Sequence, residues 1–227
     1  MKKIVILGAS IYQVPLIKAA KRMGLYTIVA SIPGEYPGFA LADKPYYINT
    51  TDKEAILAMA QQEKIDGICT TGTDVAVSTI GYVCEHMGLT GLSEAAAVRA
   101  TDKAQMKQAF AKGEVAAAAY RKAESLEEVY QAAEEIGYPV VVKRVDSSGS
   151  GITIVKRQSQ IEEAYRTALE RSSKKYVLVE KRLEGTEIGV DGVVQNGKLV
   201  FLAPHEKFVY RSKNITIPAG HGFPYRG

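Results

Sequence analysis

The sequence has few cysteines and no long apolar run. Its two cysteines, Cys69 and Cys84, are too few for a disulfide framework and too far apart for a paired zinc-ligand motif. We therefore expect both to be buried thiols in a reducing compartment. No stretch approaches the roughly 18 apolar residues of a membrane span, and the apolar run after Lys3 is too short for a signal peptide. The sequence predicts a cytoplasmic protein with no membrane partner.

Basic runs with interleaved aromatic residues, which are typical of nucleic-acid-binding proteins, are also missing. The 29 Lys and Arg against 25 Asp and Glu give a net charge of only +4, and the basic excess falls after residue 98. This small excess suits an anionic small molecule and does not indicate nucleic acid. The 46% hydrophobic content of 227 residues is enough for a core in one large or two small domains.

The first hundred residues alternate between strand and helix patterns. We expect strands at 4–7, 26–30, 46–48 and 65–70, and helices at 14–23, 51–62 and from 72–74 to 87. Short connections and strands that are apolar throughout predict a Rossmann-like, doubly wound parallel sheet in an α/β protein. Ligands of such sheets bind at the carboxyl ends of the strands. Possible substrate-binding residues there are Gly8, Thr73 and Asp74, although Gly8 could serve only a tight turn and Asp74 only a helix N-cap.

The first strand lacks a dinucleotide-binding fingerprint. Gly8 is not followed by a second and third glycine at the required spacing, and Pro15 stands where the motif would open its helix. A nicotinamide or flavin cofactor is therefore not indicated.

The middle of the chain has a different pattern. Residues 117–181 read as a β-α-β-β-α-β unit, which predicts a small antiparallel sheet covered by two helices on one face. Its strand at 140–143 delivers Lys143 beside a loop of small residues, Ser147, Ser148, Gly149, Ser150 and Gly151. A fixed lysine beside backbone N–H and hydroxyl donors can clamp a phosphate. The alternative is a glycine-containing hairpin without a ligand.

Lys103 is a second candidate for anion binding. It lies in the first turn of a helix expected at 101–110, where the helix dipole disfavours a cation, so an anionic partner is one explanation. A solvated lysine on an exposed turn is the other.

After residue 184 the pattern becomes that of an antiparallel hairpin. Strands at 188–194 and 199–202 are joined through Asn196-Gly197, the strongest short hairpin signal in the chain. The stretch His205-Glu206-Lys207 is predicted to be a solvated turn. Residues 218–224 are rich in turn-forming types and give no clear prediction.

In their order and spacing, these landmarks resemble the ATP-grasp superfamily, particularly its carbamoyl-phosphate-synthase-like and biotin-carboxylase-like branch of carboxylate–amine ligases. The resemblance runs from the turn at Gly8 and the Asp102-Lys103 pair, through Lys143, to Glu180 and Glu187. It implies a pre-ATP-grasp domain at 1–98, a connecting helix at 99–112, a lid subdomain at 113–183, and the start of a second, incomplete antiparallel subdomain at 184–227.

The same resemblance implies roles for single residues in binding ATP. Lys103 and Lys143 would hold the phosphates, and the loop from Ser147 to Gly151 would cover them. Glu187 would lie near the ribose. The adenine would be read by the segment Glu180, Lys181, Arg182 and Leu183, with Glu180 accepting a hydrogen bond from its amino group.

The implied activity is transfer of the γ-phosphoryl group of ATP to a carboxylate, followed by attack of an amine on the acylphosphate. Mg²⁺ is expected for the complete enzyme, with its ligands beyond Gly227, and no catalytic residue is assigned. The chain alone is thus expected to be inactive, as a truncated enzyme or as half of a split one. Small-molecule substrates are expected, with either a homodimer or a second polypeptide that supplies the missing half. The alternative is a non-catalytic nucleotide-binding or regulatory module without the metal site.

Overall fold

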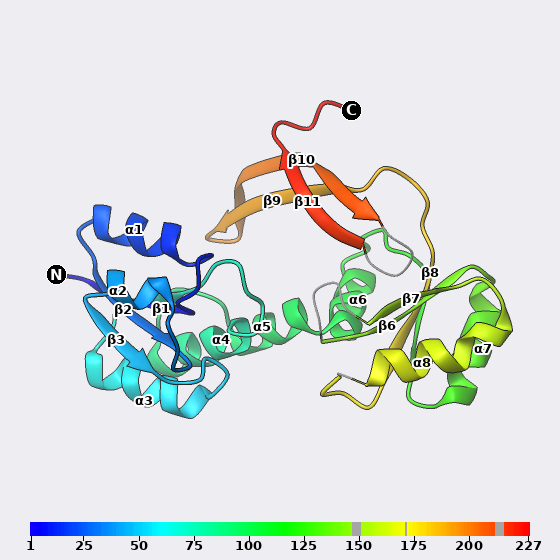
Figure 1. Ribbon diagram of the computed structural model, residues 1–227, viewed down its shortest axis with the longest axis horizontal. Helices are drawn as coiled ribbons and strands as arrows, with labels where there is room; N and C mark the ends of the chain where they lie inside the picture. Colours follow the sequence, from blue (N-terminus) through cyan, green and yellow to red (C-terminus); the bar gives the residue numbers. More distant parts are fainter. Residues whose placement is uncertain (147–150, 171, 212–215) are drawn as a thin grey trace.

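The computed structural model describes residues 1–146, 151–170, 172–211 and 216–227. Two α/β bodies stand at opposite ends of the molecule, and helices α5 (Glu94–Thr101) and α6 (Lys103–Lys112) run between them (Figure 1). An open antiparallel sheet lies above this row of helices in the same view. The described residues form three sheets, two of four strands and one of three.

The first sheet is parallel, in the order β3-β2-β1-β4. Its strands are β1 (Lys3–Leu7), β2 (Tyr26–Ser31), β3 (Lys44–Tyr47) and β4 (Gly67–Cys69). The two central strands are buried on both faces because their apolar runs are continuous. Helices α1 (Val14–Arg22) and α2 (Pro37–Leu41) cover one face, and α3 (Lys53–Glu63) and α4 (Val77–Met87) cover the other. The predicted doubly wound parallel sheet is confirmed.

The bounds of one strand and the start of one helix in this body differ from the prediction. The strand expected at 65–70 is shorter, since only Gly67–Cys69 pairs with β1. Helix α4 begins after Ala76 and has no side-chain cap, so the N-cap interpretation of Asp74 is wrong. The backbone carbonyl of Asp74 instead accepts a hydrogen bond from the N–H of Val77 in a preceding turn. The side chain of Asp74 is exposed.

Two capped helices connect the bodies. Helix α5 (Glu94–Thr101) begins at Ser93, whose hydroxyl accepts from the N–H of Ala96. Helix α6 (Lys103–Lys112) begins at Asp102, whose carboxylate accepts from the N–H groups of Ala104 and Gln105 and from the hydroxyl of Tyr176 at 2.6 Å. These caps satisfy N–H groups that have no partner within the helix. The start of α6 is thereby fixed against the second body.

The second body contains the antiparallel sheet β5-β8-β6-β7. Its strands are β5 (Tyr120–Ala123), β6 (Val140–Arg144), β7 (Ile152–Val155) and β8 (Val177–Lys181). Helices α7 (Leu126–Ile136) and α8 (Ile161–Leu169) cover one face through a core of valine, alanine and isoleucine, as the sequence predicted. The strand expected from residue 117 begins later, at Tyr120. Helix α8 is preceded by a 3₁₀ turn at Gln158–Gln160.

The third sheet has the order β11-β10-β9, with β9 (Ile188–Gln195), β10 (Lys198–Arg211) and β11 (Thr216–Gly222). The predicted hairpin is confirmed, because Asn196 and Gly197 both have positive φ, at 51° and 73°. The turn predicted at 205–207 is wrong. These residues belong to β10, where Glu206 pairs with Ile188 on one side and with Gly222 on the other. Long-range pairing on both sides outweighs the local polarity of the stretch.

Candidate functional site

Two lysines and one glutamate meet on the face of the second sheet that lies opposite α7 and α8, and Lys103 at the start of α6 lies near one of these lysines, Lys143. The carboxylate of Glu180 on β8 is buried and forms an ion pair with the ammonium of Lys143 on β6. Its other oxygen, Oε1, lies 2.8 Å from Nζ of Lys107 on α6. The geometry of this second contact gives Oε1 no directed hydrogen bond, so it is an ion pair by distance alone.

Strand alternation explains why these groups meet. On β8, Val177 and Val179 point into the core below α7 and α8, so Leu178 and Glu180 point to the opposite face. Lys143 is paired in register with Leu178 and therefore lies on that same face. Helix α6 packs there through Ala104, which shares a small apolar cluster with Leu178. The sequence reasoning missed Lys107, although its position one helical turn after Lys103 was a usable signal.

The electrostatics of this cluster favour an anion. Burial opposes the charge of Glu180, but its contacts with Lys107 and Lys143 outweigh that effect and hold its pKa below the usual value. The pKa of Lys103 is lowered, first by burial and then by repulsion from Lys143, while Asp146 and Asp74 oppose this shift. Lys103 and Lys143 repel each other at this position. An anionic group placed among them would relieve their mutual repulsion.

The end of β6 is anchored directly before the predicted phosphate loop. The carboxylate of Asp146 accepts from Nε of Arg144 at 2.9 Å, from the hydroxyl of Ser172 at 3.1 Å, and from both the N–H and the hydroxyl of Ser173 at 2.7 Å. Burial raises the pKa of Asp146, but these donors outweigh it and hold the pKa well below its usual range. These hydrogen bonds hold Asp146, and with it the end of β6, in place.

Only the last residue of the predicted phosphate loop is described. Gly151 has a φ of 67°, and its carbonyl accepts from the N–H of Arg144 at 3.2 Å, which closes the hairpin between β6 and β7. The predicted clamp residues Ser147, Ser148, Gly149 and Ser150 lie outside the described residues.

Part of the predicted adenine segment, residues 180–183, makes hydrogen bonds to neighbouring backbone groups of the second body. The ammonium of Lys181 donates to the carbonyl of Gly137 at 2.8 Å, and the backbone N–H of Lys181 donates to the carbonyl of Ala119 at 2.8 Å. The N–H of Arg182 donates to the carbonyl of Pro139 at 3.3 Å. Leu183 follows as an exposed residue. The adenine role of this segment remains a prediction.

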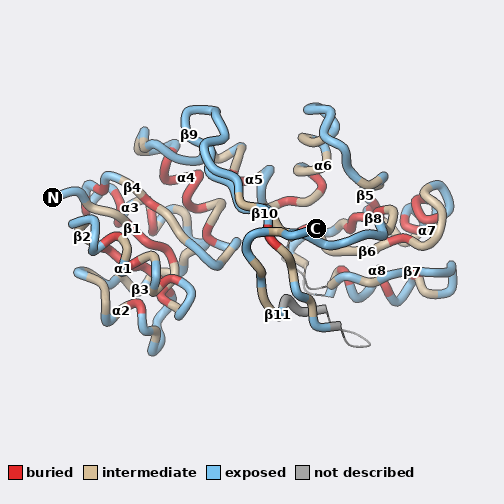
Figure 2. Tube along the Cα trace, turned by 90° about the horizontal axis from the view of Figure 1, so that it is seen from above, coloured by how far each residue is buried: buried red, intermediate tan, exposed pale blue. Residues whose placement is uncertain are grey.

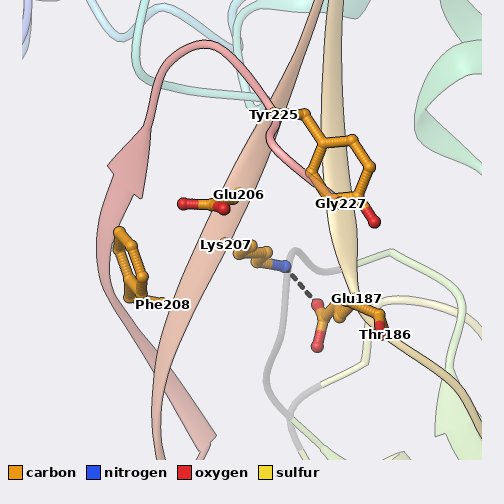
Figure 3. A pocket seen from close by; sticks show the side chains of 7 residues that line it. All are labelled: Thr186, Glu187, Glu206, Lys207, Phe208, Tyr225 and Gly227. Atoms are coloured by element: carbon orange, nitrogen blue, oxygen red, sulfur yellow. Dashed lines mark hydrogen bonds and ion pairs between the residues drawn. The ribbon is translucent and has the colours of Figure 1, made fainter.

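Glu187 lies apart from the lysine cluster. Its carboxylate pairs with Nζ of Lys207 at 2.5 Å, beside a cavity of about 330 Å³ at the third sheet (Figure 3). The cavity is lined by Thr186, Glu187, Glu206, Lys207, Phe208, Tyr225 and Gly227. The structure therefore supplies a cavity beside Glu187, whose predicted place near a ribose remains untested.

A buried glutamine joins two loops at the carboxyl edge of the parallel sheet. The side-chain oxygen of Gln13 accepts from the N–H and the hydroxyl of Ser10, at 2.9 and 2.7 Å, and its amide donates to the carbonyl of Thr71. Gly8 has a φ of 95°, and a Cβ there would lie 2.9 Å from Cδ of Gln13. The tight-turn interpretation of Gly8 thus has a structural basis. The sequence reasoning missed Gln13, because one polar residue beside a helix looks like a surface position.

None of the described helices is both long and apolar enough to cross a membrane. Nor do the described residues contain a group of three or more His, Cys, Asp or Glu side chains that could hold a metal ion. They do not by themselves fit a magnesium site.

Comparison with known proteins identifies the family. The model of the family described as "Carbamoyl-phosphate synthase L chain, ATP binding domain" matches residues 102–215. The chain belongs to this ATP-grasp family. The matched region contains Lys103, Lys107, Lys143 and Glu180, so the lysine cluster lies within the ATP-grasp domain.

Relatives extend this similarity beyond the ATP-grasp domain. The formate-dependent phosphoribosylglycinamide formyltransferase of Wolinella succinogenes is 32% identical over 183 residues, which are 79% of this chain and 47% of that protein. The solved structure of phosphoribosylglycinamide synthetase from Anaerococcus prevotii has a TM-score of 0.76 at 30% identity, over 99% of this chain and 56% of that chain. The biotin carboxylase domain of Hydrogenobacter thermophilus 2-oxoglutarate carboxylase shares the fold, with a TM-score of 0.78 at 22% identity over 94% and 52% of the two chains.

The ATP-grasp chain spans about half the length of the curated relatives it matches. The comparisons favour the predicted ligase family and do not favour the alternative of a non-catalytic regulatory module.

Proposed function

We propose that this chain is the ATP-binding portion of a ligase that activates a carboxylate as an acylphosphate for attack by an amine. The observation that carries the proposal is the pairing of Lys107 and Lys143 with Glu180, with Lys103 near Lys143, within the region matched by an ATP-binding family. A triphosphate is the anion that such a cluster suits in this family. The carboxylate and the amine would both be small molecules.

Each part of the chain has a place in this proposal. Residues 1–98 would carry the acceptor, 99–112 the connecting helices, 113–183 the lid, and 184–227 the start of the large subdomain. Lys103 and Lys143 would hold the phosphates, and residues 147–151 would close over them. Residues 180–183 would contact the adenine, and Glu187 the ribose.

The lysines would act through position and charge. They would offset the negative charge of the γ-phosphoryl group while its bond to ADP breaks and a bond to the carboxylate oxygen forms. The amine nitrogen would then attack the acyl carbon, and inorganic phosphate would leave. Because the described residues do not fit Mg²⁺, no step is assigned to that ion.

Calorimetric titration with Mg-ATP tests the nucleotide site. Lys143→Met removes a charge that would contact phosphate, so we expect affinity to fall by about ten- to a hundredfold. Lys156→Met is the matched control, since Lys156 is exposed in the same body and should not change the affinity.

Lys143 also pairs with Glu180, so its loss could lower stability. Lys103→Met, which leaves both ion pairs of Glu180 in place, is therefore measured in parallel and should weaken binding as well. If both variants bind Mg-ATP as tightly as the unaltered chain, the proposed phosphate site is wrong.

A further inference from the structure

Two of the three histidines of the chain meet on the third sheet. His205 lies on β10 and His221 on β11, and their Nδ1 atoms are 3.2 Å apart. His205 is only 5% exposed, whereas His221 is exposed on an edge strand. Imidazole nitrogens are common ligands of Zn²⁺ and of the neighbouring transition metals. Two of them at this distance are therefore a candidate for a metal site.

The register of the strands explains why the two rings meet. His221 is paired in register with Lys207, which follows His205 by two residues on β10 and so lies on the same face of the sheet. The two histidines are thus diagonal neighbours across β10 and β11, within reach of each other's side chains. Lys207 in turn pairs with Glu187 on β9, so the histidines share a face of the sheet with this ion pair.

The ring of His205 is held in one orientation by its neighbours. It stacks on the ring of Phe223, with the ring centroids 4.6 Å apart and an angle of 30° between the planes. A Cβ on Gly189 would overlap the imidazole, so the ring packs directly on the backbone of β9. Its Nε2 lies 3.6 Å from Oδ2 of Asp191. A ring that is already oriented loses little conformational freedom when it binds an ion.

Asp191 also favours one tautomer of His205. A carboxylate that faces Nε2 favours the tautomer with the hydrogen on Nε2, which leaves a lone pair on Nδ1. Nδ1 of His205 then accepts a hydrogen bond from Nδ1–H of His221. For an ion to bind both Nδ1 atoms, the hydrogen of His221 has to move to its own Nε2. Both rings stay neutral, so binding changes the tautomer of His221 and releases no net proton.

The spacing of the two rings suits an ion shared between them. A linear N–H···N bond of this length would hold the ring centroids about 5.5 Å apart, because each nitrogen lies about 1.2 Å from its ring centre. The observed separation is 4.6 Å, with an angle of 67° between the planes, so the nitrogens do not point straight at each other. An ion about 2.1 Å from both nitrogens, with an angle of about 100° at the ion, would hold the nitrogens about 3.2 Å apart and the centroids about 5 Å apart.

We propose that His205 and His221 bind a divalent transition metal ion such as Zn²⁺ through their Nδ1 atoms, with Asp191 as the positioning residue for His205. The described residues form no group of three such ligands, so water would complete the coordination of the ion. With two protein ligands we expect a dissociation constant of about 1–100 µM. Mg²⁺ prefers oxygen ligands and should not bind here. The site does not depend on the proposed ligase function.

Titration of the full 227-residue chain with Zn²⁺, free of tags and nucleotide and labelled with ¹⁵N in its histidines, tests the site. Long-range ¹H–¹⁵N NMR spectra report the tautomer and the ligation of each ring. We expect Zn²⁺ to shift Nδ1 of His205 and His221 and to move the hydrogen of His221 to Nε2, and EDTA to reverse both changes. Mg²⁺ should cause neither. The resonances of His86, whose Nδ1 contacts the carbonyl of Tyr82 at 2.9 Å on α4, should stay unchanged.

Calorimetry of the same titration measures the affinity of variants. His221→Gln changes an exposed side chain and should weaken Zn²⁺ binding by at least about tenfold, because one of the two ligands is lost. Asp191→Asn should weaken binding by about three- to tenfold and should increase the share of the Nδ1–H tautomer of His205, which a merely structural role would leave unchanged. His86→Gln is the matched control and should bind Zn²⁺ as the unaltered chain does.

Three outcomes would overturn the inference. The first is the absence of Zn²⁺ binding below about 1 mM. The second is Zn²⁺ binding that leaves the resonances of His205 and His221 unchanged, which would place the ion elsewhere. The third is equal affinity of His221→Gln and the unaltered chain.

Discussion

Glu180 holds two of the lysines of the described cluster. Its buried carboxylate pairs with Lys143 on a neighbouring strand and with Lys107 on a helix. If the ammonium of Lys143 turns toward a phosphate, Glu180 loses one of its partners. A buried carboxylate with no cation nearby is costly, so Lys107 would keep Glu180 ionised during that exchange. In this interpretation Lys107 is a positioning residue for nucleotide binding.

Substitution of Lys107 tests this role. Lys107→Met should weaken Mg-ATP binding by about five- to thirtyfold, because Lys143 would then be the only cation held by Glu180 and would leave it less readily. Lys107→Arg keeps the charge and should recover most of the affinity. Calorimetry measures both variants beside Lys156→Met. A purely structural role is indicated if Lys107→Met lowers the melting temperature while the affinity of the folded chain stays unchanged.

Gln13 supports a second prediction at the scale of one residue. Gln13→Ala would remove a buried amide that satisfies Ser10 and Thr71, so we expect the free energy of unfolding to fall by about 1–3 kcal/mol. Urea denaturation measures the loss. Gln61→Ala, on an exposed part of α3, is the control and should change the stability by less than about 0.5 kcal/mol. Equal stability of the two variants would contradict the role of Gln13 in joining the loops.

Among the elements, helix α3 is tied to the parallel sheet by a polar network at its last residue. The carboxylate of Glu63 accepts from Nζ of Lys44 at 2.5 Å, from the hydroxyl of Tyr46 at 2.6 Å, and from Nζ of Lys3 at 3.4 Å. The hydrogen bond from Lys44, followed by that from Tyr46, lowers the pKa of Glu63 from 4.5 to about 2. A helix end and two strands are thus joined at one side chain.

This network predicts a pH dependence of stability. The pKa of Glu63 is lower in the folded chain than in the unfolded chain, so its stabilising effect is fully present above pH 4.5 and is lost as the pH falls toward about 2. We expect Glu63→Gln to unfold about 1–2 kcal/mol more easily near pH 7. The difference from the unaltered chain should shrink between pH 4.5 and about 2, as measured by urea denaturation across this range. A difference that is constant over this range would contradict the interpretation.

The elements also show what the sequence could predict and why. Continuous apolar runs identified β1 and β2, and the helices expected at 51–62 and 101–110 correspond to α3 and α6, because these signals are local. Strands β10 and β11 were missed in large part, since their pairing depends on residues distant in the sequence. In the site, Lys103 and Lys143 were singled out by position and resemblance, whereas Lys107 was missed. The contacts of Glu180 with Lys107 and of Glu187 with Lys207 could not be predicted from the sequence, because each joins two elements that meet only when the chain is folded.

For the whole molecule, the three sheets differ in how well they are covered. The first two have helices packed on them and contain fully buried strand residues. In the third sheet most of the described residues of β9 and β10 are exposed, and Figure 2 shows this for β9. Its exposed apolar residues include Val193, Val194, Leu199, Val200, Phe201 and Leu202. Its local stability therefore rests mainly on backbone hydrogen bonds and on the contacts around the buried His205.

Hydrogen exchange measured by mass spectrometry should reveal this difference. Amides that open locally exchange faster where few apolar contacts are lost on opening, so peptides from β9 and the described part of β10 should exchange well before peptides from β1, β2, β6 and β8. Strand β7, which lies at the edge of the second sheet but packs Val155 into its core, is the internal control and should be intermediate. Protection of β9 equal to that of β1 would show that the third sheet is as stable as the covered sheets. The exposed apolar faces would then not determine how stability is distributed over the molecule.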